Sequence, residues 1–278
     1  MTALPFMKMH GLGNDFVVID ARNQPVSLSP DRIRAMADRH RGIGFDQIMI
    51  IRPSDAADAR IEMANASGEA VGACGNGTRC VAAFLMEEQG VDSVRLETAS
   101  GLVSADLAPG GATVDMGPAR LAWNEIPLAR DLDTLHLPLT LDTAAGRLSD
   151  AVGVNMGNPH AVFFVDDPWN FDLGAFGATL EHDPLFPERA NISLAAVAGD
   201  AIALRVWERG VGLTLACGTA ACATLVAAHR RGLCGRAATV NLPGGALQIE
   251  WREADGHVLM TGPIAVSFSG SVDPDRLA

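Results

Sequence analysis

Residues 73–77 read Ala-Cys-Gly-Asn-Gly, and an apolar run over residues 80–86 follows them and stops at Gly90. This pattern predicts a helix that begins at Cys74, with a glycine at its end. A cysteine at the start of a helix lies among backbone N–H groups that have no helical partner, at the positive end of the helix dipole. Both effects favour a thiolate and attract anions. We therefore expect an activated thiol at residue 74.

The same pattern returns 143 residues later, where Ala-Cys-Gly-Thr at residues 216–219 precedes a second apolar run that ends at Gly232. Further landmarks keep an offset of 143–145 residues: Asn14 with Asn158, Gln47 with Asn191, and Gly117-Pro118 with Gly262-Pro263. A repeat of this length is too long for a solenoid unit. It predicts two pseudo-equivalent lobes, with a site in the cleft between them that contains Cys74 and Cys217.

We expect an α+β fold, because short strand patterns surround each predicted cysteine helix. The first half closes at Gly117-Pro118, which gives an N-terminal lobe of residues 1–118, completed by the C-terminal segment 264–278. Residues 119–263 then form a linker and the C-terminal lobe. Pro127, Pro138 and Gly146, together with mixed polarity, indicate that residues 119–150 are crossover and linker.

The bulk composition excludes several classes of protein. The net charge is −12, without a run of basic residues, which argues against nucleic acid or an anionic membrane as the main partner. We find no apolar run near the ~20 residues that span a bilayer, and no export signal at the N-terminus. Five cysteines, an odd number, do not suggest a disulfide framework. We therefore expect a cytoplasmic protein.

We expect neither a cofactor nor a metal. The single lysine, Lys8, has no cofactor motif around it, so a pyridoxal phosphate Schiff base is not indicated. The chain contains no Cys-x-x-Cys or His-x-x-x-His, which argues against zinc. Cys80, Cys222 and Cys234 lie within or just after the apolar helices, and we interpret them as structural.

Two thiols on opposite sides of one bound molecule are the arrangement that inverts a stereocentre. One thiolate removes a proton from one face of a carbon, and the other thiol returns a proton to the opposite face. Proton loss next to a carboxylate places negative charge on its oxygens, and backbone N–H groups at the two helix starts would stabilise that charge. The residues that supply them are Gly75, Asn76, Gly218 and Thr219.

Charged residues are expected in the second half of the site. An apolar strand runs into Glu208 and Arg209 shortly before Cys217. Arg209 is suited to hold a carboxylate by two hydrogen bonds, and Glu208 to hold an ammonium group or tune a thiol. His160 follows the loop at Asn158, which matches the Asn14 loop, so we expect it to face the cleft rather than only to pack.

Seven motifs together resemble the diaminopimelate epimerase family in order and spacing over essentially the whole chain. They are Met-His-Gly-Leu-Gly-Asn-Asp-Phe at 9–16, Gly-Ile-Gly-Phe-Asp-Gln at 42–47, Ala-Cys-Gly-Asn-Gly at 73–77, Met-Gly-Asn-Pro-His at 156–160, Pro-Glu-Arg-Ala-Asn at 187–191, Glu-Arg-Gly at 208–210 and Ala-Cys-Gly-Thr at 216–219. Each motif alone is only suggestive, whereas the set is specific.

The resemblance implies a cofactor-independent epimerase that interconverts L,L- and meso-diaminopimelate for lysine and peptidoglycan. It also implies that each lobe is a mixed β-barrel around a central helix. Cys74, associated with the L,L substrate, and Cys217, associated with the meso one, would be the acid–base pair, and His160 and Glu208 would adjust their protonation. The resemblance implies further that the substrate is held by Asn14, Gln47, Asn65, Gly75, Asn76, Asn158, Asn191, Glu208, Arg209, Gly218 and Thr219.

The chain departs from the family pattern at three positions. Leu213 stands where many relatives have glutamate, and Ser67 where aspartate is common. Some relatives form dimers through a tyrosine near the C-terminus, and Phe268 takes the matching position here. A homodimer is therefore possible, but the residue that supports it in those relatives is absent.

Three alternatives remain at this point. One is a two-thiol racemase for proline or hydroxyproline, although Arg209 and the amide-rich lining favour a substrate with a second charged end. The second is an isomerase of the phenazine-biosynthesis type, against which the two cysteines argue. The third is a non-catalytic binding protein for amino acids.

Overall fold

The structure is a computed structural model that describes residues 3–72 and 74–277; Ala73, the first residue of the cysteine motif, lies outside them. The chain divides into two compact units. Unit 1 comprises Met1–Asp115 and Thr261–Ala278, and unit 2 comprises Met116–Met260. The boundaries lie three residues before those expected after residues 118 and 263. The C-terminal segment thus belongs to unit 1.

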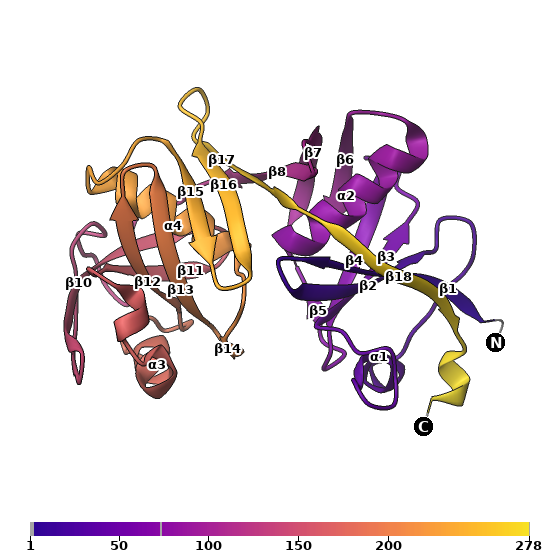
Figure 1. The fold of residues 1–278 in the computed structure, drawn as a ribbon, viewed down its shortest axis with the longest axis horizontal. Coiled ribbons are helices and arrows are strands. Elements are labelled where there is room, and N and C mark those ends of the chain that lie inside the picture. Colours follow the sequence, from indigo (N-terminus) through magenta and orange to yellow (C-terminus); the bar gives the residue numbers. More distant parts are fainter. Residues whose placement is uncertain (1–2, 73, 278) are drawn as a thin grey trace. The chain divides into compact units, whose positions relative to one another are not determined.

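Unit 1 holds the strands and helices from both ends of the chain (Figure 1). They are β1 (Leu4–Gly11), β2 (Asn14–Asp20), α1 (Pro30–Ala37), β3 (Gln47–Arg52), β4 (Ala59–Asn65), β5 (Ala70–Val71), α2 (Gly75–Gln89), β6 (Ser93–Thr98), β7 (Gly101–Ala108), β8 (Gly111–Pro118), β18 (Ala265–Val272) and the 3₁₀ helix η2 (Pro274–Arg276). Strand β8 continues past the end of the unit at Asp115.

Unit 2 repeats this order of elements from its second strand onward, apart from the additional 3₁₀ helix η1. They are β9 (Leu137–Thr143), β10 (Gly146–Asn155), β11 (Pro159–Phe164), the 3₁₀ helix η1 (Pro168–Asn170), α3 (Leu173–Glu181), β12 (Asn191–Ala198), β13 (Ala201–Glu208), β14 (Gly212–Leu213), α4 (Gly218–Arg230), β15 (Ala237–Leu242), β16 (Gly245–Trp251) and β17 (His257–Pro263).

Strand pairing confirms the internal duplication. In unit 1, β2 is parallel to β3, β3 is antiparallel to β4, and β4 is parallel to β6. In unit 2, β11, β12, β13 and β15 pair in the same three ways. The register also repeats, because Phe16 lies opposite Gln47 and His160 lies opposite Asn191. Residues 144 apart in the sequence therefore hold matching places in the two sheets.

A helix lies inside the sheet of each unit, which confirms the predicted α+β architecture. Every residue of α4 from Ala220 to Ala228 is buried, so this helix has no face toward water. Helix α2 is buried over most of residues 76–86 and ends at Gly90, whose φ of 65° is the left-handed conformation that glycine adopts readily. The two predicted cysteine helices are thus the cores around which the strands fold.

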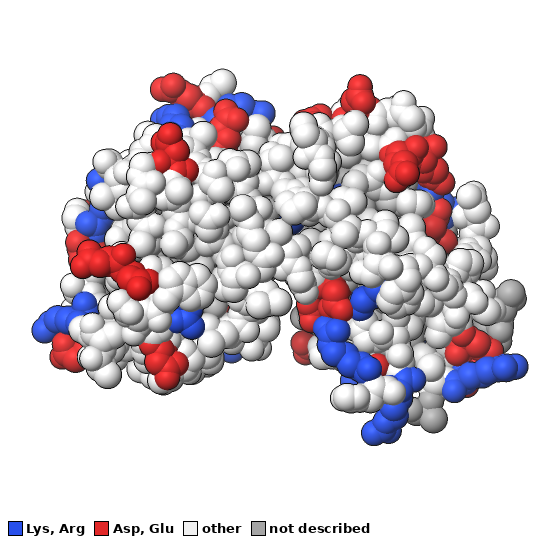
Figure 2. Space-filling view, in the orientation of Figure 1, with Lys and Arg blue, Asp and Glu red and all other residues white. Residues whose placement is uncertain are grey.

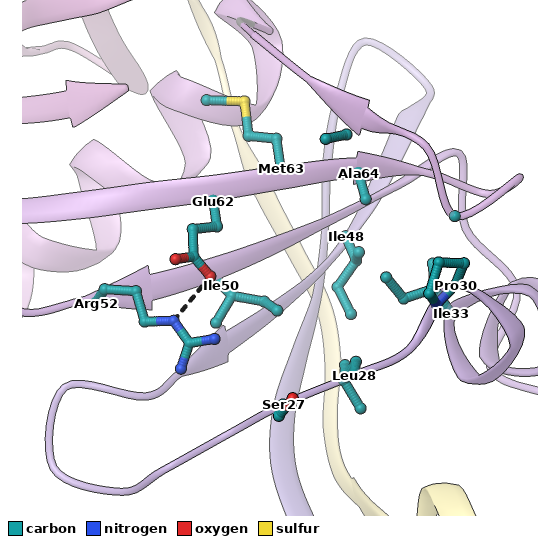
Figure 3. A pocket seen from close by; sticks show the side chains of 12 residues that line it. Ser27, Leu28, Pro30, Ile33, Ile48, Ile50, Arg52, Glu62, Met63 and Ala64 are labelled. Atoms are coloured by element: carbon teal, nitrogen blue, oxygen red, sulfur yellow. Dashed lines mark hydrogen bonds and ion pairs between the residues drawn. The ribbon is translucent and has the colours of Figure 1, made fainter. Parts of the chain in front are cut away.

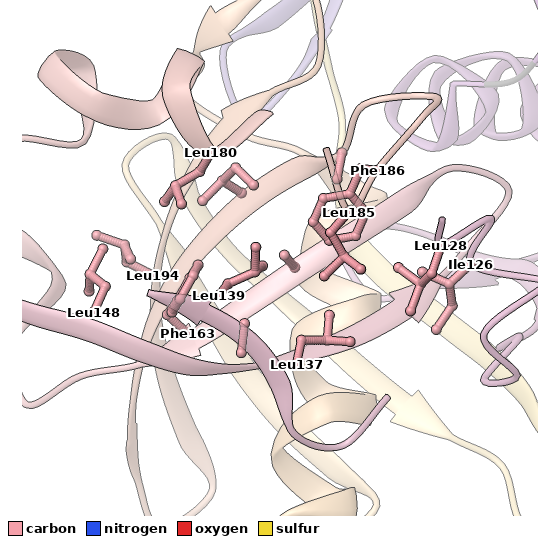
Figure 4. Packing of buried hydrophobic residues seen from close by; sticks show 14 of the residues in the cluster. Ile126, Leu128, Leu137, Leu139, Leu148, Phe163, Leu180, Leu185, Phe186 and Leu194 are labelled. Carbon is pink, nitrogen blue, oxygen red and sulfur yellow. The ribbon is translucent and has the colours of Figure 1, made fainter. Parts of the chain in front are cut away.

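Residues 119–150 are more than a linker, because the second part of this stretch forms the β9–β10 hairpin. Leu137, Leu139 and Leu148 are buried in the core cluster of unit 2, as Figure 4 shows. Pro138 is exposed between two buried leucines, so the alternation of a strand continues across it. Gly146 supplies the turn, with a φ of 133°.

The surface carries basic and acidic side chains in close proximity. Figure 2 shows Lys and Arg beside Asp and Glu on the face in view, with much uncharged surface between them. Arg252, for example, pairs with Asp255 at 2.6 Å. Among the described residues, no helix is long and apolar enough to cross a membrane.

Leu137→Ala should lower the free energy of unfolding by about 2–5 kcal/mol, because a buried leucine in a packed core is replaced by a cavity. Thr140→Ala, at an exposed position of the same strand, is the matched control and should change it by less than about 0.5 kcal/mol. Urea titrations of both variants measure this. Equal, small effects would show that the hairpin does not contribute to the core.

Candidate active site

Cys74 is the N-cap residue of α2, with an extended backbone at φ −149° and ψ 104°. The Gly77 N–H donates to its sulfur at 3.5 Å, and the Thr78 N–H donates to its carbonyl at 2.8 Å. The thiol therefore lies at the start of the helix, where it accepts from a backbone N–H, and an N–H donor of this kind stabilises a thiolate.

Close packing at the start of α2 explains the glycine at residue 77. A Cβ atom there would lie 2.0 Å from Cε of Met49, a buried residue of β3. The first turn of the helix thus rests directly on the sheet.

Asn14, the first residue of β2, reaches the thiol of Cys74. The thiol donates to its amide oxygen at 3.9 Å, and Asn76 Nδ2 donates to the same oxygen at 3.3 Å. At the next strand ends, Gln47 Nε2 donates to Asn65 Oδ1 at 3.0 Å. We call the six predicted residues of unit 1 the N-terminal half-site: Asn14, Gln47, Asn65, Cys74, Gly75 and Asn76.

A charged network that the sequence analysis missed supports Asn14. Asn14 Nδ2 donates to Asp46 at 2.9 Å, and Arg39 bridges Asp46 and Asp15 at 2.9 and 2.8 Å. Lys8, the only lysine, is buried and pairs with Asp15 at 2.5 Å. Burial raises the pKa of Asp15, but hydrogen bonds from Arg39 and Lys8 outweigh it and hold that pKa well below its usual range.

Cys217 is the N-cap residue of α4 in unit 2, and the Ala221 N–H donates to its carbonyl at 3.1 Å, matching the bond at Cys74. The Thr219 hydroxyl lies 3.5 Å from the sulfur. Only 5% of the residue is exposed. We call the eight predicted residues of unit 2 the C-terminal half-site: Asn158, His160, Asn191, Glu208, Arg209, Cys217, Gly218 and Thr219.

The thiol of Cys217 is held in its protonated form. Burial raises its pKa well above the ordinary value, and the negative charge and hydrogen bond of Glu208 raise it further. Glu208 is itself fixed by a hydrogen bond from the Thr214 hydroxyl. The C-terminal half-site therefore contains a buried, protonated thiol beside the carboxylate of Glu208.

Arg209 lies on the turn after β13 and has its backbone fixed by Asn191. Its N–H donates to Asn191 Oδ1 at 2.9 Å, and its guanidinium donates to the Glu188 carbonyl at 2.9 Å. Asn191 Nδ2 in turn donates to the Pro159 carbonyl at 3.0 Å. The motif at residues 187–191 is thus a frame for the guanidinium.

His160 is completely buried on β11, and its ring carries no charge. Burial lowers its pKa to about 3, and the charge of Arg209 acts in the same direction. Its Nε2 lies 2.8 Å from Asn158 Oδ1, which assigns the proton to Nε2 and leaves Nδ1 as an acceptor.

The predicted residues thus gather into two half-sites, one in each unit. Acceptors and donors in the N-terminal half-site come from amides, whereas the C-terminal half-site adds an acid, a guanidinium and an imidazole. Of the other cysteines, Cys80 and Cys222 are buried inside α2 and α4, and burial raises the pKa of Cys80 to about 12. Within residues 3–72 and 74–277, no group of His, Cys, Asp and Glu has the geometry to hold a metal ion.

Comparison with known proteins gives a consistent result. A family model described as diaminopimelate epimerase matches residues 6–122 and 152–266. A protein of Rhodospirillum centenum named diaminopimelate epimerase is 56% identical over 276 residues, which cover 98% of this chain and 93% of that protein. The two segments that the family model matches contain both half-sites.

Solved structures with the same fold carry several other names. A phenazine biosynthesis protein of Bacillus anthracis has a TM-score of 0.68 at 14% identity, covering 98% of this chain and 100% of that one. A hydroxyproline epimerase of Agrobacterium vitis, with bound trans-4-hydroxy-L-proline, has a TM-score of 0.67 at 18% identity, covering 97% and 92%. At these identities the likeness is one of fold alone.

His160 should make the protein less stable as the pH falls. Since its pKa is lower in the folded than in the unfolded chain, its contribution is fully present above about pH 6.5 and is lost progressively toward pH 3. The free energy of unfolding should fall by up to about 1.4 kcal/mol per pH unit in this window. Urea titrations between pH 7.5 and 4.5 measure the slope.

The His160→Gln variant should have a flatter slope over the same range, because glutamine does not titrate. His182→Gln, at an exposed position of unit 2, is the control and should keep the wild-type slope. A His160→Gln slope equal to that of the wild type would contradict the buried, neutral ring.

Proposed function

The chain belongs to the diaminopimelate epimerase family, and on that premise we propose that it is an enzyme that interconverts L,L- and meso-diaminopimelate without a cofactor. This activity supplies precursors for lysine and peptidoglycan. The observation that carries the proposal is the pair of cysteines, each at the N-cap of a helix buried in one of two duplicated units. A matched pair of this kind supplies one base and one acid to a single α-carbon.

In the L,L-to-meso direction we assign the base to Cys74 and the acid to Cys217. The Cys74 thiolate takes the α-proton, so that a C–H bond breaks and an S–H bond forms. The Cys217 thiol then gives its proton to the other face of the carbanion and is left as the thiolate. The raised pKa of Cys217 supports the assignment, because a donor must hold its proton until the carbanion forms. The reverse reaction starts with the opposite protonation states.

The negative charge that develops on the α-carboxylate needs hydrogen-bond donors. We assign them to the backbone N–H groups of Gly75 and Asn76 in one half-site and of Gly218 and Thr219 in the other. Each donor of this kind typically lowers a barrier by about 3 kcal/mol in a site without water. Fixed dipoles at two helix starts fit this task, because they need no rearrangement when the charge appears.

The remaining half-site residues are proposed to hold the substrate, above all the second amino acid end of diaminopimelate. Arg209 is assigned to a carboxylate. Glu208 and His160 are assigned to adjust thiol protonation, for which the effect of Glu208 on Cys217 is the support. Amide contacts are assigned to the remaining members, namely Asn14, Gln47, Asn65, Asn158 and Asn191.

The proposal also covers the cellular location and the oligomeric state. The enzyme needs both cysteines as thiols, which fits a reducing cytoplasm. A homodimer is proposed through β18, where Val266 is 52% and Phe268 50% exposed, and the Phe268 ring packs edge-on against Phe6 with centroids 6.0 Å apart. Exposed apolar side chains on a strand are suited to cover one another in a second copy.

The purified protein, with its thiols reduced, should convert L,L-diaminopimelate to a mixture with the meso isomer, measured by chiral chromatography. L-Proline and trans-4-hydroxy-L-proline, which lack a second amino acid end, serve as comparison substrates and should not be racemised. Turnover of proline without turnover of diaminopimelate would replace this proposal with the racemase alternative, and binding without any turnover would favour a binding protein.

Cys74→Ala and Cys217→Ala should each lower kcat by more than about 10³-fold, because neither a base nor an acid alone completes the inversion. Cys80→Ala, which removes a buried thiol six residues beyond Cys74, is the control and should keep kcat within a few-fold. A cysteine whose alanine variant keeps wild-type kcat would have no place in the mechanism.

A further inference from the structure

A buried carboxylate holds the turn that carries Glu208 and Arg209. Glu181, at the end of α3, is 3% exposed. The Trp207 indole Nε1–H donates to one of its oxygens at 2.7 Å, and the Gly210 N–H donates to the other at 2.9 Å. These two donors flank Glu208 and Arg209 in the chain, so both ends of the turn are tied to one side chain.

A third donor, Arg189, ties Glu181 to the segment that also holds the guanidinium of Arg209. Arg189 donates to Glu181 at 3.3 Å, and its φ of 60° is unusual for a residue with a side chain. The neighbouring residue, Glu188, is the one whose carbonyl accepts from Arg209. Glu181 therefore anchors both segments that determine where the Arg209 side chain lies.

Helix α3 leaves space for the indole ring of Trp207 at Gly177, which lies one turn before Glu181. A Cβ atom on Gly177 would lie 2.4 Å from the ring of Trp207. Residues 177 and 181 are four apart and share one face of the helix. Gly177 thus leaves space for the ring, and Glu181 accepts its N–H. We call these two residues of α3 the seat of Trp207.

The duplicated unit provides an internal comparison. Trp207 lies opposite Ile192 and Leu213, and by the same register its counterpart Ala64 lies opposite Ile48 and Ala70. Where unit 2 has an indole under α3, unit 1 has a pocket of about 290 Å³ beside α1. Figure 3 shows Ala64, Ile48 and Ile33 around this pocket. The ring and its seat occur in the unit whose turn carries Glu208 and Arg209.

We propose that Glu181 is a positioning residue for substrate recognition, acting through Arg209; the proposal rests on the function assigned above. A carboxylate whose two oxygens accept from three donors fixes the turn before the substrate arrives. Its loss would leave the Trp207 and Gly210 donors without their acceptor and allow the turn to move. The expected consequence is weaker binding of the substrate carboxylate, without direct damage to either thiol.

The kinetic test uses Glu181→Gln, which keeps the shape of the side chain and removes its charge. We expect KM for diaminopimelate to rise by about tenfold, the size of one charged hydrogen bond, while kcat stays within about threefold. Glu250→Gln, at an exposed position of unit 2, is the control and should change neither. In an Arg209→Leu background, Glu181→Gln should raise KM no further, because its effect passes through Arg209.

A purely structural role would give a different pattern: kcat and KM would change independently of Arg209, and the effects of the two substitutions would add. That result would overturn the proposal. If Glu181→Gln does not fold, Trp207→Phe removes one donor and keeps a ring in the seat, and the same cycle with Arg209→Leu applies.

Hydrogen exchange of the Gly210 amide tests whether Glu181 holds the turn, and it needs no assay of activity. We expect exchange at residues 207–210 to speed up at least about tenfold in Glu181→Gln, with α4 unchanged. Unchanged exchange would overturn the proposal. A wild-type protein that turns over no diaminopimelate would instead count against the proposed function, and the exchange result would still decide whether Glu181 holds the turn.

Discussion

The structure depends on one recurring constraint: a helix is buried inside a sheet, and its first N–H groups must find partners there. At Cys74 those groups converge on a sulfur and a carbonyl, and the same carbonyl bond recurs at Cys217. The fold thus places a thiol at the start of a buried helix twice.

The two units use this constraint differently. The thiol of unit 1 is joined by amides, whereas that of unit 2 has a carboxylate beside it that raises its pKa. Duplication followed by divergence at a few strand ends explains how one architecture gives two thiols different surroundings. The pair Ala64 and Trp207 shows the same divergence in the packing, since a ring fills one unit and a pocket remains in the other.

Local patterns in the sequence were sufficient for the two helices that begin after Cys74 and Cys217, whereas α3 was not predicted. Gly90 and the apolar run before it predicted α2, and the constant offset predicted where Cys217 would lie. The β9–β10 hairpin was not recognised because Pro138 and Gly146 resemble breaks, although one is exposed and the other forms the turn. Glu181 could not be identified either, because its partners Trp207 and Gly210 lie in another segment of the chain and a charged residue alone resembles a surface residue. The role of Lys8 was also missed, although its partner Asp15 lies on the adjacent strand.

The proposed mechanism needs two thiols that act on opposite faces of one carbon. The most direct measurement follows deuterium during the first few per cent of the reaction of L,L-diaminopimelate in heavy water. We expect the meso product to carry one deuterium at the inverted carbon while the remaining substrate carries none, because the proton is taken by one group and replaced by another. Equal labelling of substrate and product from the start would mean that a single group both removes and returns the proton, and would contradict the account.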